Sequence, residues 1–213
     1  NSLAYLIACN EYLNNKPLVK KYLNKSYEMK SIFSGDIYKW AGIQLMWQGN
    51  HQLSNTVFLE QLKIEKKNSN ENGIIEVLTN IGLNCFYKGD YKNALENFNL
   101  AIDQGGEKEL FNVVETLTFK HLANEELGVS EDDNFLRDYI NKKMEADSDW
   151  FKNEPEYINW ALYEYFGEDK YIIEAKRKLD LVLDNIDSDK LKNLSSYPAY
   201  QVILDSYNSM QNL

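Results

Sequence analysis

One stretch of the chain, NIGLNCFYKGDYKNALENFNLAI at residues 80–102, restricts the possible folds more than any other feature. Gly82 and Gly89 stand seven residues apart, inside two runs whose apolar residues recur at helical spacing. Helices pack closely where small residues stand at their crossing, and glycine readily adopts the left-handed conformation that ends a helix. The stretch therefore predicts a helical hairpin that crosses at Gly82 and Ala94 and turns at Gly89.

The same seven-residue spacing recurs along the chain, at offsets of 34 to 40 residues. Gly42 and Gly49 repeat it most closely, and Phe58 stands where the first stretch has Phe98. More degenerate copies begin at Ala8, His121 and Trp160. Internal periodicity in this range is typical of helical solenoids, in which each repeat packs on its neighbours.

We therefore expect an all-α fold, built as one superhelical domain of about five helix pairs with a C-terminal capping helix. The predicted repeats are approximately 1–33, 34–70, 71–107, 108–147 and 153–187, and the capping helix is 197–213. The predicted helices are 2–14, 17–31, 35–48, 51–66, 73–88, 91–104, 108–127, 131–145, 155–166, 170–185 and 198–210. Each of the three prolines is the first residue of one of these runs, a position where proline is tolerated.

Charge and composition exclude several classes of function. The formal net charge is −10, and phosphate recognition needs a basic face, so we expect no direct nucleic-acid contact from this segment. No apolar run reaches the roughly 18 residues of a membrane span. Two cysteines, Cys9 and Cys85, make no disulfide framework and indicate a reducing, cytoplasmic setting. The chain opens NSLAYL without methionine, which predicts a fragment of a longer protein.

Residues 80–102 resemble a tetratricopeptide repeat (TPR). The matching residues are Gly82, Gly89, Asp90, Tyr91, Ala94, Phe98 and Ala101, and a second match contains Tyr38, Gly42, Gly49 and Phe58. The resemblance implies a right-handed TPR-like superhelix. The chain departs from the family in two ways, because Gly106 stands where a proline usually closes the repeat, and the repeats are longer than usual.

Long, degenerate repeats in a chain rich in lysine and asparagine look like the peptide-pheromone receptors of Gram-positive bacteria and their phages. That group includes the Rap, PlcR, Rgg and arbitrium-receptor types, and residues 80–83 are similar to the YNIGL-like segments of Rap-type repeats. In that group an asparagine on an inner helix holds the backbone of a short peptide, and the resemblance assigns this role to Asn80. It implies a quorum-sensing-type receptor that regulates transcription. Rap-type phosphatase activity would need an N-terminal helical bundle and DNA binding a helix-turn-helix, and neither is evident in the sequence.

In TPR arrays the first helix of each pair lines the concave surface, which predicts a peptide-binding groove. The predicted site residues are Asn80, Asn84, Lys39, Ile43, Trp47, Leu83, Tyr87, Glu125, Glu126, Tyr157, Glu164 and Tyr165. Aromatic walls with a few polar anchors suit a short extended peptide, and the glutamates suit a cationic side chain, most naturally arginine. The alternative is that the aromatic residues pack between repeats, the glutamates are solvated, and the asparagines cap or join helices.

Signals for catalysis are weak. His51 and His121 are isolated, no cluster has zinc spacing, and no phosphate loop or nucleophile elbow occurs. We expect no enzyme activity, no cofactor and no metal. An alternative function is a TPR scaffold or adaptor for protein–protein interaction or homodimerisation. An adaptor that clamps acidic tails would need a basic groove, and this groove offers only Lys39.

Overall fold

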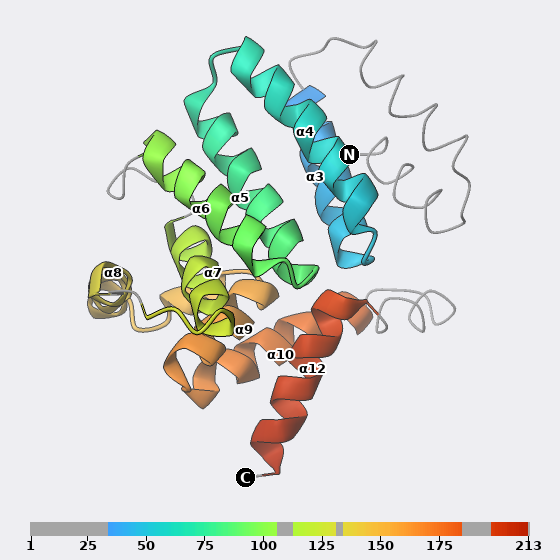
Figure 1. Ribbon diagram of the computed structural model, residues 1–213. Coiled ribbons are helices and arrows are strands. Elements are labelled where there is room, and N and C mark those ends of the chain that lie inside the picture. Colours follow the sequence, from blue (N-terminus) through green and yellow to red (C-terminus); the bar gives the residue numbers. More distant parts are fainter. Residues whose placement is uncertain (1–33, 106–112, 131–133, 185–196, 213) are drawn as a thin grey trace. The chain divides into compact units, whose positions relative to one another are not determined.

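The computed structural model describes residues 34–105, 113–130, 134–184 and 197–212 (Figure 1). These residues form nine α-helices and one short 3₁₀ helix, and no strand occurs among them. The chain divides into two compact units, residues 1–112 and 113–213. The predicted first repeat, with Cys9, lies outside the described residues.

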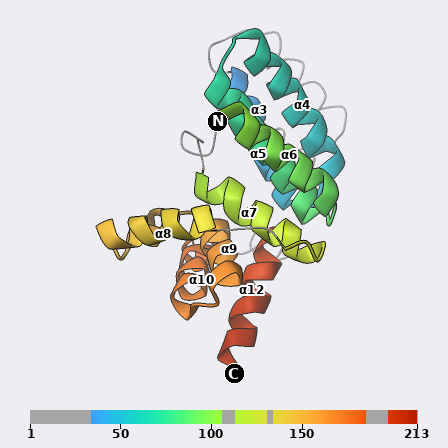
Figure 2. The ribbon, with the colours of Figure 1, turned by 60° about the vertical axis from the view of Figure 1, so that its left-hand side comes forward.

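The described part of unit 1 consists of two helical hairpins (Figures 1 and 2). In the first, α3 (Ser34–Trp47) packs against α4 (His51–Lys67), and in the second, α5 (Glu71–Tyr87) packs against α6 (Tyr91–Gly105). The hairpins join through α4 and α5, and α3 also contacts α5. All four helices begin and end within two residues of their predicted positions.

In each hairpin of unit 1, one glycine allows the two helices to approach closely. A Cβ atom at Gly42 would lie 2.3 Å from Phe58 Cε1, and one at Gly82 would lie 2.5 Å from Phe98 Cε1. These separations are far below van der Waals contact, so each phenylalanine ring fills the space that a side chain would need. Both rings are fully buried. The predicted crossing of the helices at Gly82 is therefore confirmed, and it recurs at Gly42.

The turns that follow the first helix of each pair also repeat. Four glycines there have φ between 67° and 79°: Gly49, Gly89, Gly128 and Gly167. Beyond three of them a backbone N–H donates to the end of the preceding helix, from Asn50 to Leu45 O, from Asp90 to Cys85 O and from Val129 to Asn124 O, each at 2.9 Å. Such bonds satisfy carbonyls that the helix end leaves unpaired, and glycine adopts positive φ without a steric penalty. The predicted turn at Gly89 is confirmed.

Unit 2 contains α7 (Val113–Glu126), α8 (Asn134–Ala146), the 3₁₀ helix η1 (Trp150–Asn153), α9 (Glu156–Phe166), α10 (Asp169–Asp184) and α12 (Pro198–Gln211). The α9 and α10 helices form a hairpin, and α7 packs chiefly on α9. Few residues of α7 contact α8, so these two helices do not form the tight hairpin that the repeat pattern predicts. The crossing position of α7 holds His121 instead of glycine, and Arg137 stands 16 positions later, where the hairpins of unit 1 have phenylalanine.

The short helix η1 is absent from the sequence-based prediction, yet it supplies part of the core of unit 2. Trp150 and Phe151 are buried in a cluster that also contains Tyr171. The side-chain amide of Asn159 holds this segment, because its Nδ2 donates to Phe151 O at 2.9 Å and to Glu154 O at 3.0 Å. Residues 150–153 therefore connect α8 to α9 as a packed element.

The C-terminal helix α12 covers the α9–α10 hairpin, as predicted (Figure 1). It buries Ala199, Tyr200 and Ile203. A polar contact adds to this apolar interface, since Trp160 Nε1 donates to Ser206 Oγ at 3.1 Å.

Removal of all residues after Ser196 should destabilise unit 2 by about 4 kcal/mol, because the apolar surface under two large side chains of α12 would be exposed. Thermal melts followed by circular dichroism, with size-exclusion chromatography for aggregation, measure the effect. Removal of the last four residues alone, which lie beyond Ile203, is the control. A soluble chain truncated after Ser196 that melts like the full chain would contradict the capping role.

Glu156, in the first turn of α9, makes the stability of the chain depend on pH. Burial raises the pKa of this carboxyl above its ordinary value, and this outweighs the lowering by its own backbone N–H and by Lys178. Because the pKa is raised in the folded state, the contribution of this carboxyl to stability is fully present below its unfolded pKa of about 4.3. That contribution is lost as the pH rises through the folded-state pKa. Glu156→Gln should therefore raise the melting temperature at pH 7 and have little effect near pH 4. Glu168→Gln, at an exposed position, is the control, and a lower melting temperature for Glu156→Gln at pH 7 would contradict the assignment.

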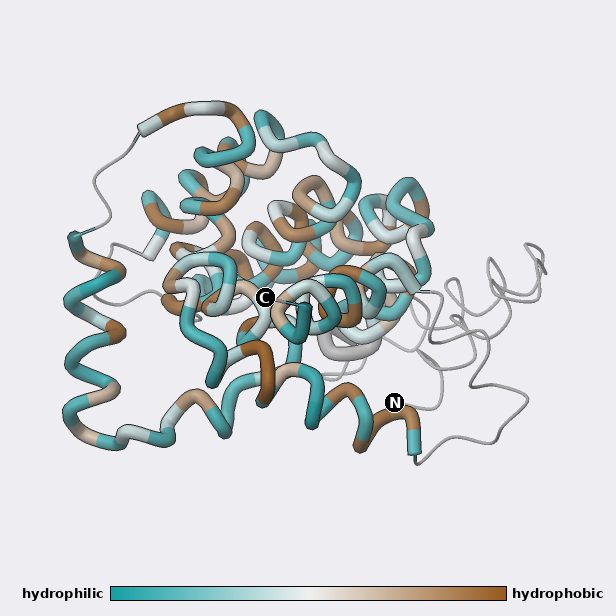
Figure 3. The backbone as a smooth tube through the Cα atoms, turned by 90° about the horizontal axis from the view of Figure 1, so that it is seen from below, coloured by the Kyte–Doolittle hydropathy of each residue, from teal (hydrophilic) through white to brown (hydrophobic). Residues whose placement is uncertain are grey.

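Within the described ranges, the helices are too short or too polar for any of them to cross a membrane. Figure 3 shows hydrophilic and hydrophobic residues interspersed along these helices. That pattern is typical of helices that bury one face and expose the other.

Candidate functional site

Seven of the predicted site residues lie on the first helices of the two hairpins of unit 1. On α3 they are Lys39, Ile43 and Trp47, and on α5 they are Asn80, Leu83, Asn84 and Tyr87. The α3 residues are half-buried, whereas three of the four on α5 are buried. The α5 surface is thus more enclosed than an open groove would be.

Asn80 is 5% exposed, and its Nδ2 atom has no hydrogen-bond partner among the described residues. Most buried polar groups in proteins are paired, and leaving one unpaired costs about 1–3 kcal/mol. Asn80 Nδ2 is therefore a buried donor on an inner helix, without a protein partner in the described part of the chain. It is the same residue to which the receptor resemblance assigns the peptide backbone.

Asn84 stands one helical turn beyond Asn80 and is fully engaged. Its Nδ2 donates to His51 O at 3.0 Å, and its Oδ1 lies 3.0 Å from His51 Nδ1. These contacts tie α5 to the first residue of α4. The sequence left inter-helix bonding as an alternative role for Asn84, and the structure has this arrangement. The two contacts occupy both polar atoms of the side chain.

An ion pair between Lys39 and Glu76 joins the inner helices α3 and α5. The two side chains are 25% and 17% exposed, so the pair is half-buried. Glu76 precedes Asn80 by four residues, which places the two on the same face of α5. The nitrogen of Lys39 also lies 5.5 Å from the centre of the Trp40 ring. Glu76 was not among the predicted site residues.

A second inner carboxylate occupies the equivalent place in unit 2. Glu115 follows Glu76 by 39 residues, the period of the repeats, and is 5% exposed. Tyr157, one of the predicted site residues, donates its hydroxyl to Glu115 Oε1 at 2.6 Å. The repeat period was the sequence signal that could have singled out both glutamates.

The three predicted cation-binding glutamates of unit 2 are exposed. Glu125 and Glu126 end α7, and Glu125 Oε1 lies 3.4 Å from His121 Nε2. Glu164 on α9 accepts a hydrogen bond from Ser206 Oγ at 2.8 Å. Solvent weakens the attraction of exposed carboxylates for a cation, so this setting favours a solvated role for them.

Tyr165, the last predicted site residue of unit 2, already stacks with a cation of its own chain. Arg137 of α8 lies 5.2 Å from the centre of the Tyr165 ring and 5.7 Å from that of Phe166. The Tyr165 ring also meets His121 edge to face at 4.7 Å. A peptide cation on this face of Tyr165 would compete with Arg137.

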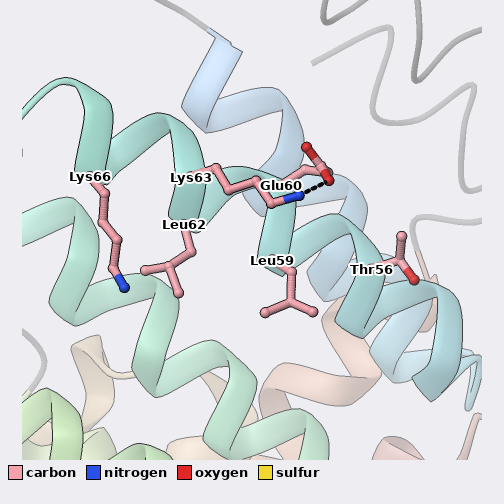
Figure 4. Close-up of a pocket in the computed structure, with 6 residues that line it drawn as sticks. All are labelled: Thr56, Leu59, Glu60, Leu62, Lys63 and Lys66. Atoms are coloured by element: carbon pink, nitrogen blue, oxygen red, sulfur yellow. Dashed lines mark hydrogen bonds and ion pairs between the residues drawn. The ribbon is translucent and has the colours of Figure 1, made fainter.

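A shallow hollow of about 340 Å³ lies on α4, apart from all of these residues. Its lining residues are Thr56, Leu59, Glu60, Leu62, Lys63 and Lys66. Figure 4 shows Leu59, Leu62 and Lys66 along one side of the helix, while Lys63 reaches Glu60 at 2.6 Å. No predicted site residue contributes to the hollow.

Metal and thiol chemistry find little support in the described part of the chain. No group of three or more histidine, cysteine, aspartate or glutamate side chains there could hold a metal ion. Cys85 is half-buried, and burial is the main cause that raises the pKa of its thiol. A raised pKa disfavours the thiolate, which is the nucleophilic form.

The structure is similar to the crystal structure of the apo form of RapI. The likeness covers 99% of this chain and 84% of that chain, with a TM-score of 0.57 and 16% sequence identity. The chain has a RapI-like fold. RapI is a TPR-like helical solenoid, so the predicted all-α fold class is confirmed.

No family model matches the sequence, and a search of curated proteins finds no relative. At 16% identity the likeness to RapI establishes the fold alone. The repeat boundaries, the single-domain organisation and the grouping of the site residues into one groove stay predictions.

Proposed function

We propose that this chain is the peptide-binding regulatory domain of an intracellular quorum-sensing-type receptor. It binds a short linear peptide on the inner helices of its repeats. The observation that carries this proposal is the buried, unpaired amide nitrogen of Asn80. The RapI-like fold supports it, because the Rap-type resemblance assigns the peptide backbone to this same asparagine.

A peptide carbonyl is the partner that Asn80 Nδ2 lacks. The bound peptide accepts this hydrogen bond, which removes the cost of the unpaired donor. Half-buried Trp47 and Tyr87, on α3 and α5, supply apolar surface for peptide side chains. Binding regulates the receptor by favouring one conformation, to the extent that the peptide binds that conformation more tightly.

The domain acts as a receptor and performs no catalysis. This segment contacts no nucleic acid itself, and the peptide carries at least one cationic residue. Glu125, Glu126 and Glu164 remain candidates to bind that cationic residue, although their side chains are exposed.

A thermal-shift screen of short secreted peptides tests the function. A receptor gains stability from its peptide by mass action, by about 2.7 kcal/mol at a hundred times the dissociation constant. The same peptide should stabilise the Lys92→Ala variant equally, since Lys92 is exposed on an outer helix. If no peptide raises the melting temperature, the proposal fails, and the scaffold or dimerisation function takes its place.

A further inference from the structure

The ion pair between Lys39 and Glu76 lies where a peptide on the inner helices of unit 1 would meet it. It bridges the two first helices, α3 and α5, and both side chains keep partial access to solvent. An inter-helix pair that served stability alone could equally lie on the outer helices. Here it stands beside the residue that carries the proposed function.

Asn80 supplies the second, independent observation. It follows Glu76 by one helical turn and is 5% exposed, and its Nδ2 donor has no protein partner among the residues that the structure describes. A ligand that satisfies this donor comes within reach of Glu76, because residues four apart on a helix are surface neighbours.

The two partners of the ion pair are not equally replaceable. Lys39 has a second favourable contact, the Trp40 ring, which is 44% exposed and within cation–π range. Among the described residues, the ionic partner of Glu76 is Lys39. The chain also carries a net charge of −10, which attracts cations over long range.

We propose that Glu76 is the residue that selects a cationic peptide, by exchanging Lys39 for a positively charged group of the ligand. The cation is an arginine or lysine side chain or the amino terminus of the peptide. Lys39 withdraws onto Trp40, and Asn80 holds the adjacent peptide backbone. This inference rests on the proposed function and deepens it, because it moves cation recognition from the exposed glutamates to Glu76.

Exchange predicts opposite signs for substitutions of the two partners. Glu76→Gln removes the carboxylate and should weaken binding of a cationic peptide about tenfold, since hydrogen bonds to charged groups contribute at the upper end of the normal range. Lys39→Met removes the competitor and should strengthen binding about threefold or more. An ion pair with a purely structural role would give losses, or no change, in both variants.

Pooled hexapeptides with one position fixed as arginine, glutamate or glutamine serve as the probe, with thermal shift of the full chain as the readout. The arginine pool should stabilise the chain most, Lys39→Met should enlarge that preference, and Glu76→Gln should abolish it. The control pair is Lys63→Met and Glu60→Gln, an exposed pair on α4 that should change nothing. Lys39→Gln is a second variant in case Lys39→Met does not fold.

Two outcomes separate this inference from the proposed function. If pools stabilise the chain and Asn80→Ala removes the effect, but Glu76→Gln keeps the arginine preference, the exchange is overturned and the receptor function stands. Preference for the glutamate pool would likewise overturn the exchange. If no pool stabilises any variant, both proposals fail.

Discussion

Phe98→Ala should lower the free energy of unfolding by about 3–5 kcal/mol, because it empties the space between α6 and α5 that Gly82 creates. The ring is fully buried and stands where a Cβ on Gly82 would clash, so the gap would face a residue that has no side chain to fill it. Phe58 has the same relation to Gly42 in the first hairpin. Phe58→Ala should therefore cost a similar amount.

Urea denaturation followed by circular dichroism measures both losses. Leu100→Ala is the control, because Leu100 lies on the same helix as Phe98 and is 47% exposed. It should change the free energy of unfolding by no more than about 0.5 kcal/mol. Equal stability of Phe98→Ala and Leu100→Ala would refute the repeat alignment on which the account of the fold rests.

The helices and turns of unit 1 could be predicted because their signals are local. The spacing of apolar residues predicts each helix. Gly49 and Gly89 predict the turns, and in the structure both residues adopt positive φ. The crossing glycines were also predictable, since Gly42 and Gly82 recur at the repeat spacing with an aromatic residue 16 positions later. In α7 the corresponding residue is His121, and there the predicted hairpin with α8 is loose.

The contacts that decide the chemistry of the site depend on residues far apart in sequence. Asn84 bonds to His51, 33 positions earlier, and no local pattern distinguishes it from Asn80, which has the unpaired donor. Lys39 and Glu76 are 37 positions apart, so the sequence marked the lysine as a lining residue without its partner. Tyr165 was predicted from its place on α9, but its stacking with Arg137 depends on where α8 lies.

Asn80→Ala should weaken binding of the cognate peptide by roughly 5- to 150-fold, because the peptide carbonyl would lose its partner. The same substitution should change the stability of the unliganded chain by less than about 1 kcal/mol, since relief of the unpaired donor offsets the packing lost with the buried side chain. Asn84→Ala is the matched control. It breaks the bonds to His51 and should cost more stability than Asn80→Ala does.

The most direct test of the receptor account is calorimetric titration of the peptide found by the screen into the unmodified chain and the Asn80→Ala variant, with thermal melts of both. The account predicts a much weaker dissociation constant for Asn80→Ala together with an almost unchanged melting temperature of the unliganded protein. Affinity within twofold of the unmodified chain would show that Asn80 does not hold the peptide, and the account would be contradicted.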